Sequence, residues 1–273
     1  MVQPLRIEDP EVPVPPFMLE ERVRYSTTTR PMRPTDMNAN EILARYQAGE
    51  RQFVGLACQE AELLQLELPG VNLSQTDLRQ SRLGRTNLQR ATLQKVDLSE
   101  ALLWGTDCTD ADLSGALLRE ADLTGAVLRR TKLDGAYLLQ ASLTGIDATE
   151  ASLVGAVLIE ADLRPSLEQT TDFTGANLSS ADLSYASLNS VCFKNANFAN
   201  ARLCRAKVSL RSRPGCVQAD FTGANLQAAD LSYADLTGII LRQANLTGAD
   251  LTGVSLDKAD LSGATMPDGS IHP

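Results

Sequence analysis

The chain is poor in the residues that build ordinary globular cores and active sites. Aromatic residues make up 4% of its 273 residues, and it has one tryptophan and one histidine. A globular domain of this length needs large rings to fill its core, whereas a one-dimensional stack of short repeats needs few. The scarcity of aromatic residues therefore argues against a conventional globular core.

The sequence also lacks the patterns that mark membrane-spanning proteins, secreted proteins and several kinds of enzyme or metal site. No apolar run approaches the roughly 18 to 20 residues of a membrane-spanning helix, and the opening MVQPLRIEDPEV contains no apolar signal core. The five cysteines show no framework spacing, so we expect a cytoplasmic protein without structural disulfides. His272 adjoins the last residue, no cysteine pair has metal-ligand spacing, and no phosphate-binding glycine loop is present. The sequence therefore predicts no enzymatic activity, no metal site and no cofactor.

A five-residue repeat fills most of the chain. Residues 111–135 read ADLSG ALLRE ADLTG AVLRR TKLDG, with leucine third and alanine or threonine first in each unit. This period matches neither a helix nor a strand, so neither element would gather these side chains on one face. A coil that turns a corner in every unit directs both positions inward. The pattern predicts a solenoid with leucine and small residues, such as Ala121, in its interior.

The tandem Ala-Asp/Asn-Leu motif, which covers residues 51–266, resembles the pentapeptide-repeat family. The resemblance implies an all-β solenoid, namely a right-handed quadrilateral β-helix with four pentapeptides in each coil. At that rate the repeats form about ten coils. The resemblance says less about activity, because members of this family share a shape more than a function.

Three segments follow from the composition. Residues 1–37 are rich in proline and predict an extended or disordered leader. Residues 38–50 predict a helix that covers the first coil, with Asn38 or Asn40 as its N-cap. Residues 51–273 predict the β-helix, with breaks near 164–170 and 209–218, and Ile271 is placed to plug its last coil. The apolar residues expected to pack are Val14, Phe17 and Met18 in the leader and Ile42, Leu43 and Tyr46 in the capping helix.

Grouping the residues by twenty, which is one predicted coil, reveals an apolar stripe on the outside. Hydrophobic side chains replace the usual Asp or Asn before the central leucine on three successive coils. An exposed stripe of this kind predicts a protein interface. Its members are Leu117, Tyr137, Leu139, Val157 and Ile159, with Trp104 on a neighbouring face.

The net charge of −9 is unevenly distributed, because residues 164–218 carry a positive excess within an otherwise acidic chain. This basic band would suit a phosphate or an acidic protein, and it consists of Arg202, Arg205, Lys207, Arg211 and Arg213. The acidic total makes direct nucleic-acid binding unexpected.

These features favour a non-catalytic scaffold or adaptor that binds a protein partner, with homo-oligomerisation also open. Two alternatives stay open. Because some quinolone-resistance members of the similar family imitate duplex DNA, one is an inhibitor of a topoisomerase-like enzyme. The other is a structural tether, in which the leader grips a larger complex.

Overall fold

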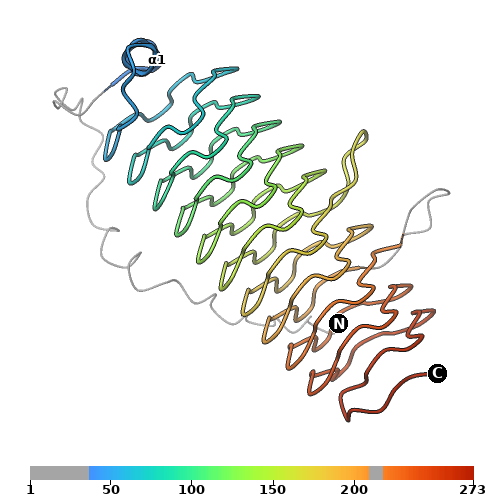
Figure 1. Ribbon diagram of the computed structural model, residues 1–273. Coiled ribbons are helices and arrows are strands. Elements are labelled where there is room, and N and C mark those ends of the chain that lie inside the picture. Colours follow the sequence, from blue (N-terminus) through green and yellow to red (C-terminus); the bar gives the residue numbers. More distant parts are fainter. Residues whose placement is uncertain (1–36, 209–217) are drawn as a thin grey trace, which may run out of the picture. The chain divides into compact units, whose positions relative to one another are not determined.

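The computed structural model describes residues 37–208 and 218–273 (Figure 1). The chain divides into two compact units, Met1–Pro34 and Thr35–Pro273. The first unit lies outside the described residues, as do the leader residues Val14, Phe17 and Met18. The second unit contains one helix followed by a stack of coils.

Four ladders of isolated parallel β-bridges join the coils, so each coil has four sides. Most bridges pair residues twenty positions apart, which agrees with four five-residue units in each coil. We name the four faces by their ladders: face I runs from Gln52 to Thr265, face II from Ala57 to Asp250, face III from Glu62 to Ser255, and face IV from Glu67 to Asp260.

Backbone hydrogen bonds between coils hold the stack together. The N–H of Leu118 donates to the carbonyl of Tyr137 at 2.8 Å, and the N–H of Leu117 donates to the carbonyl of Val96 at 2.9 Å. Within a unit, the corner adds a bond from the N–H of Ala121 to the carbonyl of Leu118 at 3.1 Å. Because most partners lie one coil away, a coil is stable only when it is stacked on others.

Each corner places its last residue in the left-handed backbone region. The φ angle is +67° at Gly125, +56° at Glu120 and +52° at Arg130. A type II turn needs a positive φ at its third residue, which glycine adopts freely. Other residues adopt it at a cost of about 1 to 2 kcal/mol. Their frequent use at corners indicates that the hydrogen bonds between coils outweigh this local cost.

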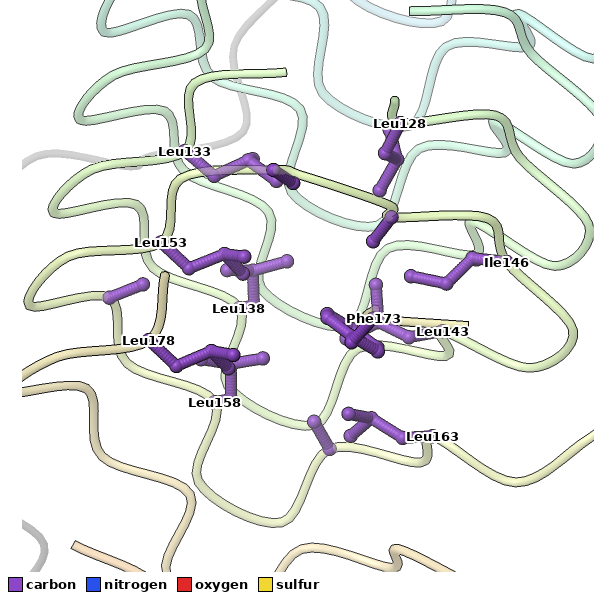
Figure 2. Close-up of a cluster of buried hydrophobic side chains, with 14 of the residues drawn as sticks. Leu128, Leu133, Leu138, Leu143, Ile146, Leu153, Leu158, Leu163, Phe173 and Leu178 are labelled. Carbon is purple, nitrogen blue, oxygen red and sulfur yellow. The ribbon is translucent and has the colours of Figure 1, made fainter. Parts of the chain in front are cut away.

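The interior is filled as the repeat predicts. Leu123 is 1% exposed and Ala121 is fully buried, and Figure 2 shows Leu133, Leu153 and Leu178 stacked along one side of the core. Phenylalanines replace leucine near two register changes, with ring centroids 4.7 to 5.4 Å apart. The packed rings belong to Phe173, Phe193, Phe198 and Phe221.

The register changes twice along the ladders. Asp147 pairs with Asp172, 25 positions later, because residues 164–170 leave the coil as a loop. The hydroxyl of Thr171 fastens this loop, since it accepts from the N–H of Gly145 at 2.8 Å and donates to the carbonyl of Arg164 at 2.9 Å. The second change lies at residues 209–217, outside the described part, where the pairing shifts to 28 positions.

Helix α1, Ala39–Gln47, packs on the first coil. Asn38 is its N-cap, because the side-chain oxygen accepts from the N–H of Glu41 at 2.9 Å. Ile42 is fully buried within the core cluster, and the Tyr46 hydroxyl donates to the carbonyl of Pro69 at 2.8 Å. Leu43 is partly exposed.

The end of the chain does not fill the last coil. Ile271 pairs with Thr265 in an antiparallel bridge and is 72% exposed. The prediction that Ile271 plugs the interior is therefore wrong. Backbone pairing along the edge of face I directs this side chain away from the core, and Leu251 and Leu261 stay only partly buried.

Aspartates on the outer faces fasten many of the units to their own corners. Asp147 accepts hydrogen bonds from the backbone N–H of Thr149 at 3.1 Å and from its hydroxyl at 2.7 Å. Partial burial opposes ionisation of this carboxyl, but the hydrogen bonds from Thr149 and Arg129 lower its pKa overall. The pKa values of Asp107 and Asp220 are lowered in the same way.

We expect Ala121→Leu to destabilise the β-helix, because the interior beside Ala121 has no room for a larger side chain. The expected loss is about 1 to 3 kcal/mol, seen as a lower urea midpoint. Ala199→Leu, on a partly exposed outer position, is the control. Equal midpoints for the two variants would contradict the packing argument.

We also expect stability to fall in acid. Because the folded pKa of these aspartates lies below the unfolded value of about 3.9, the folded state binds fewer protons near that pH. The stabilisation is present above pH 4 and is lost as the pH falls through the lower folded pKa. Asp147→Asn keeps an acceptor oxygen, as Asn177 does towards the N–H of Ser179 at 3.1 Å. Urea midpoints at pH 7 and pH 3 should differ less for this variant than for the wild type.

Candidate functional site

The predicted apolar column lies on face II. The ladder places Leu117, Tyr137 and Val157 one above another on successive coils, as the twenty-residue spacing predicts. The adjacent positions of the same ladder are Asp97 and Asp182. The column is thus a local replacement of the acidic surface by apolar side chains.

The column is less exposed than the sequence predicted. Tyr137 is 5% and Ile159 is 7% exposed, although neither belongs to the core cluster. Leu117, Leu139 and Val157 are partly exposed. Coils lie only about 4.8 Å apart, so stacked outer side chains cover one another. The surface therefore presents parts of several side chains instead of a fully exposed stripe.

Charged groups border this column. Arg119 bridges the carboxylate of Glu100 at 2.8 Å and also pairs with Glu120. Burial raises the pKa of Tyr137, and the nearby Arg119 opposes this rise. The Tyr137 side chain thus stays neutral at physiological pH and, being 5% exposed, leaves only a small part of its surface for an external contact.

Trp104 lies on face III and rests on Gly84 of the preceding coil. A Cβ atom at Gly84 would lie 2.6 Å from Cζ2 of the indole, so only glycine leaves room for this packing. The guanidinium of Arg85 lies 5.1 Å from the ring centroid. Leu102 on the same coil is 37% exposed, and the ion pair of Arg119 with Glu100 lies at the corner between it and the face II column.

The basic band is only partly available for a partner. Arg202, Arg205 and Lys207 are exposed on one coil. Arg202 pairs with Asp182 at 3.4 Å, whereas no carboxylate lies within ion-pair distance of Arg205 in residues 37–208 and 218–273. Arg211 and Arg213 lie outside the described residues.

The structure brings together three residues that the sequence reasoning did not connect. Tyr185, Arg205 and Tyr233 occupy the corner between faces II and III on successive coils. Tyr185 precedes Arg205 by twenty residues, but Tyr233 follows it by 28. A fixed spacing of twenty residues misses Tyr233, because the second break adds eight residues to that coil. Counting four repeat units from Arg205 instead leads to Tyr233.

Within the described residues, no group of three or more His, Cys, Asp or Glu side chains is arranged to hold a metal ion. None of the helices in that part of the chain has the length and apolar character to cross a membrane. Burial raises the pKa of the Cys108 thiol to about 12, so this cysteine is a packing residue.

The four-sided coil and its repeated unit place the chain in a known class. Residues 67–105, 106–145, 171–209, 216–243 and 229–266 match the pentapeptide repeats, in eight copies. The chain belongs to the pentapeptide-repeat family, whose members form right-handed quadrilateral β-helices. No curated protein matches the chain.

Among solved structures, the chain is similar to HetL from the cyanobacterium Nostoc sp. strain PCC 7120, a pentapeptide-repeat protein involved in the regulation of heterocyst differentiation. The two are 52% identical over 86% of this chain and 100% of HetL, with a TM-score of 0.85. QnrB1, a plasmid-mediated fluoroquinolone resistance protein, is 18% identical over 76% of this chain and 86% of its own, with a TM-score of 0.39. Rfr23 from the cyanobacterium Cyanothece 51142 is 25% identical over 50% of this chain and 92% of its own, with a TM-score of 0.30.

The single tryptophan allows the packing at Gly84 to be tested directly. We expect Gly84→Ala to displace the indole of Trp104 and shift its fluorescence emission to longer wavelength, because the added methyl group occupies the space of the ring. Thr124→Ala, one coil beyond Trp104 on the same face, adds no atom and should leave the emission unchanged. An unchanged spectrum for Gly84→Ala would contradict the observed contact.

Proposed function

We propose that this chain is a non-catalytic regulatory scaffold that binds a protein partner through the apolar column on face II. The observation that carries the proposal is the alignment of Leu117, Tyr137 and Val157 in a ladder that holds aspartate on either side. The column needs no apolar residue for folding, since Asp97 and Asp182 occupy equivalent positions. On this proposal, about ten coils form a rigid rod that α1 caps and that keeps the column in a fixed geometry.

The similarity to HetL supports a regulatory role. HetL is involved in the regulation of heterocyst differentiation, and this chain is 52% identical to it over the whole length of HetL. A DNA-mimicking inhibitor needs a continuous acidic surface, which the exposed Arg202, Arg205 and Lys207 interrupt here. A topoisomerase supercoiling assay separates the two functions, because the scaffold should leave the rate unaltered.

Val157→Asp tests the proposal, with Val127→Asp as its matched control. Both valines precede a central leucine and are partly exposed, but Val127 lies on face IV between Asp107 and Asp147. The new aspartate should fold without strain, as Asp182 does when it accepts from the N–H of Ser184 at 3.0 Å. We therefore expect both variants to unfold at similar urea midpoints.

The readout is the set of proteins captured from Nostoc extract by the immobilised chain, quantified by mass spectrometry. We expect at least one captured protein to be depleted about fivefold or more by Val157→Asp and retained by Val127→Asp. Equal capture by the two variants would count against face II as the binding surface. The same comparison without residues 1–37 shows whether the leader, with Val14, Phe17 and Met18, competes for the column.

A further inference from the structure

Tyr185, Arg205 and Tyr233 form a stacked column on the corner between faces II and III. The guanidinium carbon of Arg205 lies 5.6 Å from the ring centroid of Tyr185 and 5.9 Å from that of Tyr233. The Arg205 side chain also donates a hydrogen bond to the Tyr185 hydroxyl at 3.2 Å. Two aromatic rings therefore hold one exposed cation in place.

The backbone that carries these three side chains is also constrained. All three residues adopt the left-handed corner conformation, with φ angles of +62°, +57° and +58°. The ring of Tyr233 extends over Gly253 of the next coil, where a Cβ atom would lie 2.7 Å from Cδ1. Tyr233 is nevertheless 61% exposed. An ordered side chain with this much exposed ring loses little entropy when it binds.

The charge at this corner differs from that of the earlier coils. The same corner position holds Glu60, Glu100, Glu120 and Glu160. At Arg205 the sign reverses, and no carboxylate of the described chain pairs with the guanidinium. Arg202 on the adjacent face is already bound to Asp182. Within residues 37–208 and 218–273, Arg205 thus keeps donors that form no ion pair and can meet an external anion.

We propose that the Tyr185–Arg205–Tyr233 column binds a carboxylate from an acidic segment of a protein partner. A guanidinium presents paired N–H donors whose planar geometry matches a carboxylate, and the flanking rings supply apolar contact. This inference rests on the proposed function as a protein-binding scaffold and adds a second contact to it. Face II connects the two contacts, because its ladder runs from Val157 through Asp182 to Arg202, two coils or roughly 10 Å along the stack.

The test uses the full-length chain and a fluorescein-labelled decaglutamate peptide at low salt, followed by fluorescence anisotropy. Because the protein carries a net charge of −9, general electrostatics repels this probe, and binding requires a local site. We expect Arg205→Gln to weaken binding about fivefold or more. Arg205→Lys should also weaken it, since lysine keeps the charge but lacks the planar fork.

Arg242→Gln is the matched control, because it removes the same charge from face IV, where Arg242 pairs with Asp260 at 2.6 Å. It should bind decaglutamate within about twofold of the wild type. Absence of binding by the wild type, or equal weakening by Arg205→Gln and Arg242→Gln, would overturn the proposed site. Neither result would contradict the proposal that face II binds a partner, because the effect of Val157→Asp is measured by protein capture and not by decaglutamate binding.

Discussion

The hydrogen bonds between successive coils are the constraint on which the rest of the structure depends. A bridge residue bonds to the preceding coil, and the residues on either side of it bond to the following one. The N–H of Leu117 donates to the carbonyl of Val96, and the N–H of Leu118 donates to the carbonyl of Tyr137. These bonds fix the path of the backbone so tightly that corners accept glutamate, glutamine or arginine at a positive φ. They also align side chains on the outside, because equivalent positions of neighbouring coils must lie above one another.

This alignment makes the outer surface independent of the core. The inward positions are occupied by leucine and small residues, whereas the outward position before each leucine accepts aspartate, valine or tyrosine without altering the ladder. Aspartate adds hydrogen bonds to its own corner, as Asp147 shows. An apolar residue gives up those bonds, and this loss is a reason for proposing that the column binds a partner.

The two proposed contacts differ in chemistry but share one scaffold. The column of Leu117, Tyr137 and Val157 offers apolar area, and the corner at Arg205 offers a single oriented cation. A partner that lies along the stack could contact the face II column with apolar residues and Arg205 with a carboxylate that follows them. Membership in the pentapeptide-repeat family explains the scaffold, and the surface residues of this chain define what the scaffold presents.

The sequence by itself determined the period, the inward direction of Leu123 and Ala121, and the alignment of Tyr137 with Val157, because these follow from a unit that repeats without interruption. It also located the helix that packs on the first coil. Only the tertiary structure decided that Tyr137 is nearly buried, since its exposure depends on side chains twenty residues away on the coils above and below it. The structure likewise decided that Tyr233 meets Arg205, because that contact depends on how many residues the second break removes from the ladder.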